Sequence, residues 1–253
     1  MSTGAITSYI DVAQLTLYAF WVFFAGLIYY LHRENKREGY PLESERSPHV
    51  KVQGFPAMPE PKTYRLADGR VFRAPNPKRE AAPQHAVPHA GHPGAALQPT
   101  GNPMLDNVGP GSYAMRADLP DVTAEGLPRI VPLRAAAGFG VATPDIDPRG
   151  LPVVGCDGRS GGTVVELWVD RSEMLFRYLE VDAGSDRRVL LPMNLARVER
   201  RRVRVDSIRG AHFAQVPVTR EAAQVTLLEE EKIMAYYGAG TLYAEPSRAE
   251  PLF

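Results

Sequence analysis

The chain has 253 residues, its 29 lysines and arginines balance its 29 aspartates and glutamates, and its mean hydropathy is −0.23. A net charge of zero argues against a generally basic nucleic-acid-binding protein and against an acidic solvating tail. The one cysteine, Cys156, excludes an internal disulfide framework and a cysteine-based zinc site.

The first predicted element is a transmembrane helix over residues 12–31. This run of twenty residues contains no charged side chain, and only Gln14 and Thr16 are clearly polar. At about 1.5 Å per residue it spans about 30 Å, the thickness of a bilayer's hydrocarbon core. A buried core helix would carry a polar stripe, and a signal peptide would have a basic segment before it and a cleavage site after it. The sequence contains none of these features.

The residues that flank this helix predict its orientation. Arg33, Lys36 and Arg37 follow the apolar run, whereas the N-terminal side carries only Asp11. Because lysine and arginine are enriched on the cytoplasmic side, we expect residues 1–11 to face outward and the residues after the helix to lie in the cytoplasm. Ala19 and Gly26 share one helix face and would let another helix approach closely, so the span is either an anchor or a packing partner.

A proline-rich segment follows the helix. Thirteen of the 23 prolines lie between Pro41 and Pro110, which predicts an extended segment over 32–104 that needs another surface to lie on. One exception is a short hairpin over 63–72, with its turn at Asp68 and Gly69. Three histidines in the same segment have no carboxylate or thiol nearby in sequence, so a solvated loop is favoured over a metal site. They are His85, His89 and His92.

From Ile130 onward, short runs rich in valine, isoleucine and leucine alternate with turn residues. We expect strands over 163–169, 176–181, 188–191 and 202–206, which together predict an antiparallel barrel or sandwich. Near the C-terminus, Thr226 and Glu229 form a capping-box pattern that opens a helix. Gly238 or Gly240 is expected to close it.

No motif for an enzyme appears: the sequence lacks a P-loop, a dinucleotide fingerprint, a G-x-S-x-G elbow and an H-E-x-x-H pair. The strongest basic patch is either a solvated hairpin end or a contact for anionic lipid or an acidic partner. Nucleic acid is a weaker interpretation, because no aromatic residues interleave with these arginines. The patch consists of Arg197, Arg200, Arg201, Arg202 and Arg204.

Two carboxylates directly after a predicted strand are more suggestive. Asp170 and Glu173 are three residues apart, and Arg177 follows closely. Such a group can hold its carboxyl pKa values at intermediate levels and pass protons along with bound water. Spacing alone favours an ordinary surface ion pair, so another observation has to decide between the two interpretations.

Seven ordered blocks, spread over nearly the whole chain, resemble the H subunit of the purple bacterial photosynthetic reaction centre. The first block reads G-L-I-Y-Y-L-H-R-E-N-K-R-E-G-Y-P-L, and the sixth reads L-W-V-D-R-S-E. The blocks cover residues 26–42, 98–104, 108–113, 132–139, 147–158, 167–173 and 226–232.

The resemblance implies one N-terminal transmembrane α-helix and a mainly β cytoplasmic domain, a PRC-barrel-like antiparallel barrel with a short C-terminal helix. The implied divisions are a periplasmic N-terminus (1–11), the transmembrane helix (12–31), an extended proline-rich cytoplasmic segment on the membrane-facing surface (32–104) and the cytoplasmic PRC-barrel-like domain (105–253). Such a chain is a non-enzymatic structural subunit that caps the pigment-binding L and M subunits in the photosynthetic inner (chromatophore) membrane and assists proton delivery to the secondary quinone. It binds no cofactor itself, since bacteriochlorophyll, bacteriopheophytin, quinones and non-haem iron belong to the partner subunits. Further candidate partners are a cytochrome subunit, the light-harvesting antenna and membrane lipids, but not nucleic acid.

The resemblance also assigns the proton path. Its carboxylates correspond to Asp170 and Glu173, with Arg177 beside them, and Glu230 is a further candidate. Some members of the family carry a histidine pair before the strand at Ile130, where this chain has none, so proton uptake is expected at Asp121 and Glu125 instead. A second hypothesis is a membrane-tethered PRC-barrel adaptor that binds RNA or a protein partner through its arginine patch.

Overall fold

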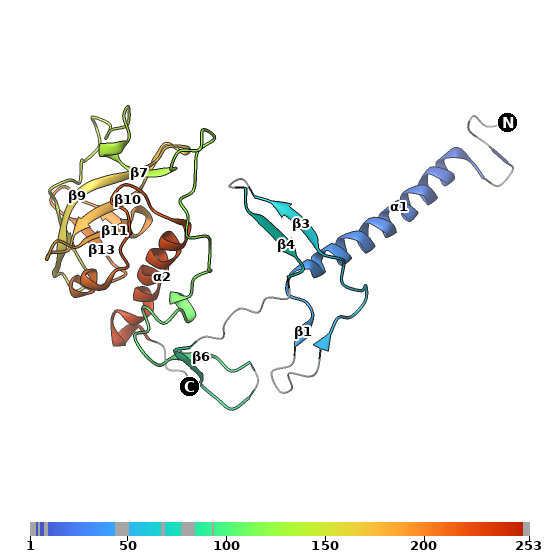
Figure 1. Ribbon diagram of the computed structural model, residues 1–253, viewed down its shortest axis with the longest axis horizontal. Helices are drawn as coiled ribbons and strands as arrows, with labels where there is room; N and C mark the ends of the chain where they lie inside the picture. Colours follow the sequence, from blue (N-terminus) through green and yellow to red (C-terminus); the bar gives the residue numbers. More distant parts are fainter. Residues whose placement is uncertain are drawn as a thin grey trace. The chain divides into compact units, whose positions relative to one another are not determined.

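The computed structural model describes residues 4, 6–7, 10–43, 51–66, 69–76, 84–92 and 94–249. The chain divides into two compact units, Met1–Ala81 and Ala82–Phe253 (Figure 1). The first unit holds the apolar helix and two small hairpins. The second holds a large sheet and the C-terminal helix.

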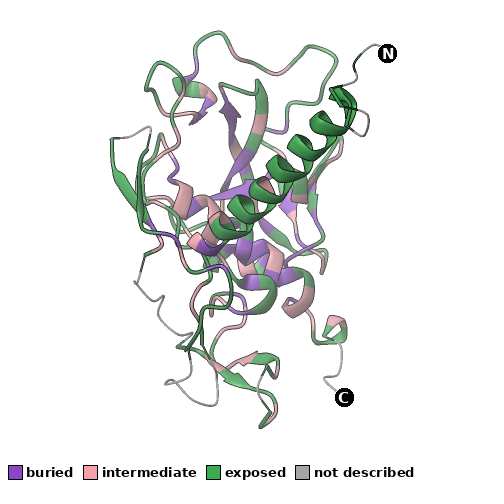
Figure 2. Cartoon of the chain, turned by 90° about the vertical axis from the view of Figure 1, so that its right-hand side faces the viewer, coloured by how far each residue is buried: buried purple, intermediate pink, exposed green. Residues whose placement is uncertain are grey.

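Helix α1 spans Val12–Glu34, so the predicted helix is confirmed and extends three residues further. Asp11 opens it with a capping box: its carboxylate accepts a hydrogen bond from the Gln14 backbone N–H at 2.7 Å. None of the residues of α1 is buried by the described residues of its own unit, and Figure 2 shows the helix exposed along its length. Among the described residues, Val12–Arg37 is the one helical stretch long and apolar enough to cross a membrane.

The C-terminal end of α1 is tied to the loops of its own unit. The buried Lys36 donates to the carbonyl oxygen of Pro56 at 2.6 Å, and Arg37 donates to the carbonyl oxygen of Ala74 at 2.9 Å. Glu34 pairs with Lys62 at 2.6 Å. The basic residues after the helix therefore anchor the start of the extended segment.

The proline-rich segment contains three two-stranded ladders. The expected hairpin is confirmed as β3 (Lys62–Arg65) and β4 (Val71–Ala74), although Asp68 of its turn lies outside the described residues. Two further ladders were not expected: β1 (Leu42–Glu43) with β2 (Lys51–Val52), and β5 (Ala86–Pro88) with β6 (Leu97–Pro99). Prolines at the ends of β5 and β6 are compatible with pairing because a two-stranded ladder leaves outer N–H positions unused. The histidine-containing segment is thus partly a hairpin rather than a loop.

The second unit is built on a curled half-barrel sheet, which confirms the mainly β prediction. The order is β11-β10-β9-β8-β13-β12, with β7 beside β9, and every pair is antiparallel except β8 with β13. All four predicted strands are present, in β9, β10, β11 and β13. The strands are β7 (Ile130–Pro132), β8 (Pro152–Val154), β9 (Ser160–Asp170), β10 (Leu175–Asp182), β11 (Arg188–Pro192), β12 (Ala196–Val198) and β13 (Val203–Val205).

The basic patch lies on the β12–β13 hairpin, at one edge of this sheet. Arg197 lies directly opposite Arg204, while Arg202 pairs with Glu199 at 2.8 Å and Arg204 with Asp206 at 2.7 Å. Charged edge strands oppose unwanted sheet pairing, so this hairpin is consistent with the solvated-end interpretation.

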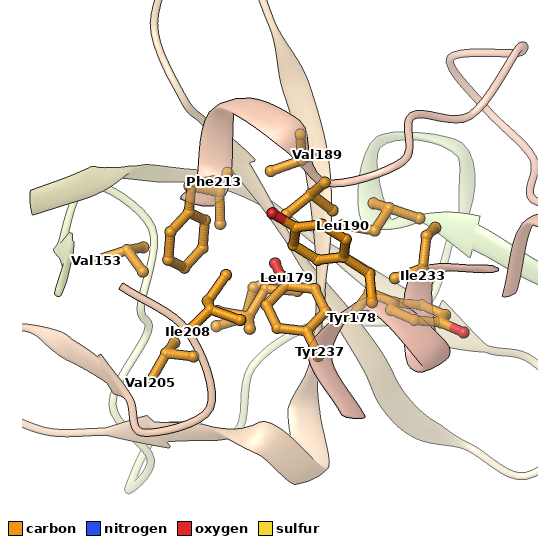
Figure 3. Close-up of a cluster of buried hydrophobic side chains, with 14 of the residues drawn as sticks. Val153, Tyr178, Leu179, Val189, Leu190, Val205, Ile208, Phe213, Ile233 and Tyr237 are labelled. Atoms are coloured by element: carbon orange, nitrogen blue, oxygen red, sulfur yellow. The ribbon is translucent and has the colours of Figure 1, made fainter. Parts of the chain in front are cut away.

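Helix α2 (Leu227–Tyr243) packs into the core of the second unit. Tyr237 and Ile233 belong to one buried cluster with Leu179 of β10 and Phe213 of η5, as Figure 3 shows. Short 3-10 turns complete the chain: η1 (Asn35–Arg37), η2 (Gly109–Gly111), η3 (Leu133–Ala135), η4 (Met193–Leu195), η5 (Gly210–Gln215) and η6 (Pro246–Arg248).

The predicted start of α2 is confirmed, but its predicted end is wrong. Thr226 and Glu229 form the expected capping box. The helix then runs through Gly238 and Gly240 and is capped by Ala244. A side chain at Gly240 would place its Cβ 2.4 Å from Cγ2 of Ile208. This glycine therefore permits close packing of the helix instead of ending it.

Candidate functional site

A polar hollow of about 600 Å³ lies in the second unit, between the β9–β10 ladder, the start of α2 and the segment before β7. Five carboxylates and three guanidinium groups line it. They belong to Asp121, Asp170, Glu173, Glu230, Glu231, Arg116, Arg129 and Arg177. The hollow thus brings together five of the six predicted site residues. The sixth, Glu125, is exposed and is not among the lining residues.

Arg129 connects three of the carboxylates. Its Nε lies 2.9 Å from Oδ2 of Asp170, its Nη1 lies 3.1 Å from Oδ2 of Asp121, and its Nη2 contacts Oε1 of Glu173. Sequence reasoning did not single out this arginine. Its position follows from strand pairing instead. Ile130 pairs with Asp170 in the β7–β9 ladder, which places the preceding residue, Arg129, beside that carboxylate.

Asp170 is held as an anion at the end of β9. Its side chain is 1% exposed, and Oδ1 accepts hydrogen bonds from the backbone N–H groups of Ser172 and Glu173, each at 3.0 Å. Burial by itself raises the pKa of Asp170, but the hydrogen bonds from Arg129 and from these two amides outweigh it and lower the pKa below its ordinary value. Of the two interpretations that the spacing left open, the lowered pKa of Asp170 favours the ion pair for this residue.

Glu173 lies at the exposed side of the cluster. Its side chain is 51% exposed, whereas that of Arg129 is 25% exposed. The turn that carries it is fixed by Asp170, whose carbonyl oxygen also accepts the N–H of Met174 at 2.8 Å. The cluster thus runs from a solvent-accessible carboxylate to a buried one through one guanidinium group.

A β-bulge in β10 shapes the opposite side of the hollow. Phe176 pairs with Val169 and Tyr178 pairs with Trp168, so Arg177 is an extra residue between them. Tyr178 consequently lies on the same face of the ladder as Asp170, and its hydroxyl donates to Oε2 of Glu230 at 2.7 Å. Without the bulge, Tyr178 would lie on the other face.

Glu230 has the opposite electrostatic environment from Asp170. Burial raises the pKa of Glu230 above its ordinary value, although the Tyr178 hydroxyl and the nearby Arg177 and Arg116 act in the other direction. The neighbouring Glu231 pairs with Arg116 at 3.5 Å. The hollow therefore contains one carboxyl group whose pKa is lowered and one whose pKa is raised. Such a separation is typical of groups that exchange protons.

A second acidic cluster lies on the same ladder but outside the hollow. Glu166 and Glu180 are direct cross-strand partners, and both are buried. Glu180 accepts hydrogen bonds from Nε1 of Trp168 at 2.9 Å and from Nη1 of Arg134 at 3.0 Å. These contacts tie the η3 turn to the sheet, which is a structural role.

No group of three or more histidine, cysteine or acidic side chains within the described part of the chain is arranged to hold a metal ion. The structure places His85 directly before β5 and His89 directly after it. The carbonyl oxygen of His85 accepts the N–H of Thr100 at 2.9 Å, and the N–H of His89 donates to the carbonyl oxygen of Ala96 at 2.8 Å. These backbone contacts close the ends of the β5–β6 ladder.

Two family models match the sequence. The model described as photosynthetic reaction centre, H-chain N-terminal region, matches residues 4–135, which is more than half of the chain. The model described as PRC-barrel domain matches residues 145–212, which include β8 to β13. The two matches follow one another along the chain, and the hollow draws its lining from both regions and from α2.

Proposed function

The chain belongs to the photosynthetic reaction-centre H-chain family, and from this premise we propose that it caps the L and M subunits on the cytoplasmic side and helps to deliver protons to the secondary quinone. In this role it binds none of the pigments, quinones or iron of the complex. It supplies a membrane helix, a polar surface and titratable groups.

The membrane part of the proposal rests on α1. None of its residues is buried within the described chain, so we expect lipid and neighbouring helices to cover its exposed apolar side chains. The lysine and arginine residues that follow the helix favour a periplasmic N-terminus and a cytoplasmic second unit. We further propose that the segment 32–104 lies on the membrane-facing surface of the complex.

The proton-delivery part rests on one observation, the hollow that gathers Asp121, Asp170, Glu173, Arg177 and Glu230. A quinone that is reduced twice takes up two protons, and a site sealed from water needs polar groups and bound water to supply them. Glu173 is open to solvent, and the pKa of Glu230 is raised by burial. A proton taken up at the exposed carboxylates could thus be held further in.

The test uses the intact pigment-containing complex. In Glu173→Gln, proton-coupled reduction of the secondary quinone should be slower across the pH range, while the first electron transfer stays nearly unchanged. Glu221→Gln is the matched control, because Glu221 is also exposed but does not line the hollow. Unaltered flash kinetics in Glu173→Gln would refute the proton role. Failure of the chain to co-isolate with an L/M pair that shows near-infrared bacteriochlorophyll bands would refute the subunit role.

A further inference from the structure

Tyr178 lines the hollow, but its hydroxyl has no part in the proposed proton path. The Tyr178 side chain is almost fully buried, with 2% of its surface exposed. A buried tyrosine hydroxyl needs a hydrogen-bond partner, and here the partner is the carboxyl group of Glu230 at 2.7 Å. Among the described residues, Tyr178 is the one side chain that donates a hydrogen bond to Glu230.

We propose that Tyr178 is a positioning residue that sets the proton affinity of Glu230. The inference rests on the proposed role of the chain in proton delivery, and it adds a regulating group to that site. A hydrogen bond to a carboxyl oxygen stabilises the ionised form more than the neutral form, so the Tyr178 hydroxyl opposes the effect of burial on Glu230. It thereby limits how far burial raises the pKa of Glu230.

Tyr178 acts as a fixed donor and does not carry the proton itself. Burial and the neighbouring Glu230 raise the pKa of the Tyr178 hydroxyl well above its ordinary value, so the phenol keeps its proton. The β-bulge at Arg177 sets the register of the ring, because it pairs Tyr178 with Trp168 and so places it on the same face of the ladder as Asp170, from where its hydroxyl reaches Glu230 of α2. The donor is therefore held in place by the backbone of β10.

Other charges also face Glu230 and must be kept constant in a test. Arg177 from β10 and Arg116 from the segment before β7 lower the pKa of Glu230, while Asp121 raises it. Glu231 on the same helix is partly neutralised by Arg116. Replacing tyrosine by phenylalanine changes none of these charges and keeps the ring.

The test is Tyr178→Phe in the intact complex, with the carboxyl band of Glu230 followed by infrared difference spectroscopy as a function of pH. Glu230→Gln assigns the band. Removing the hydroxyl should raise the pH at which the band titrates by about one unit, and the pH dependence of the second quinone reduction should move the same way. Tyr236→Phe is the matched control, since Tyr236 is equally buried and donates to the carbonyl oxygen of His212 instead.

A second variant protects the test against loss of folding. A ring-fluorinated tyrosine at position 178 keeps the shape of the side chain and makes the phenol a stronger donor, so it should lower the titration pH of the same band. An unchanged titration of Glu230 in both variants would overturn the inference, even if Glu173→Gln still slows quinone reduction. A shifted titration with unchanged quinone kinetics would keep Tyr178 as a regulator of Glu230 and refute the proposed proton role.

Discussion

Arg129 should be the residue on which the hollow most depends for stability. In Arg129→Gln, the three carboxylates that it bridges lose their common partner. Asp170 is the critical one, because it is almost fully buried and its charge cannot be solvated by water. Asp121 and Glu173 are 42% and 51% exposed, so water replaces much of what they lose.

The size of the effect follows from the burial of each group. Removing one partner of a fully buried ion pair costs about 3–5 kcal/mol. Here Arg129 is a quarter exposed, and Asp170 keeps two backbone hydrogen bonds, so the loss should be about 2 kcal/mol, or roughly thirtyfold in the unfolding equilibrium. Arg129→Lys should lose about half as much, because a lysine keeps the charge but cannot reach three carboxylates at once.

Urea unfolding of the full chain in detergent can measure this difference. Trp168 is a suitable fluorescent reporter because it is buried in the sheet, and Trp21→Phe removes the other tryptophan of the sequence. Arg177→Gln in the same background is the control. Arg177 is exposed and lines the same hollow, so its loss should change the free energy of unfolding by at most about 0.5 kcal/mol.

The pH dependence gives a second check. The folded-state pKa of Asp170 is lowered, so its stabilising contribution is complete above the unfolded value of about 3.9 and is lost as the pH falls through the folded value. The difference between the wild-type chain and Arg129→Gln should therefore disappear in strong acid. A loss below about 0.5 kcal/mol at neutral pH, or a difference that persists unchanged in acid, would refute this account.

Two further predictions concern close packing. Gly240→Ala should destabilise the second unit by about 1–3 kcal/mol because its Cβ would overlap Ile208, whereas Gly140→Ala, which meets open space, should be nearly neutral in the same urea titration. Gly26→Leu should leave the chain folded, since no atom of the described residues lies within 4 Å of a Cβ at Gly26, but should reduce co-isolation with the L/M pair. Undiminished recovery of the complex would show that this helix face is not the packing face.

Long-range pairing explains which parts of the fold could be predicted. Helix α1 follows from length and composition alone, and β9 and β10 follow from long apolar runs. In contrast, β7 and β8 have three residues each and carry no periodic signal. The parallel pairing of β8 with β13 joins Val153 to Val203, and no local pattern encodes such a contact. Gly240 was misleading because glycine serves equally to end a helix and to let one pack closely.

The residues of the site likewise differ in whether the sequence alone could reveal them. The carboxylates of Asp170 and Glu173 are three residues apart in sequence, and the family resemblance singled them out as site residues. Arg129 lies 41 residues from Asp170 and could be found only once the β7–β9 ladder was known. The position of the Tyr178 side chain depends on a β-bulge. This backbone irregularity moves the side chain to the other face of the ladder, and it has no sequence signature as strong as that of a turn.

The two sides of the hollow carry carboxyl groups whose pKa values are shifted in opposite directions. Asp170 is ionised by its guanidinium and amide donors, so it resists taking up a proton and instead holds Arg129 in position. Burial raises the pKa of Glu230, and the hydrogen bond from Tyr178 opposes this rise. In the proposed proton role, the exposed carboxylates around Arg129 meet the solvent and Glu230 lies further in. The zero net charge of the chain is compatible with this arrangement, because the proton path depends on where the paired charges lie and not on their sum.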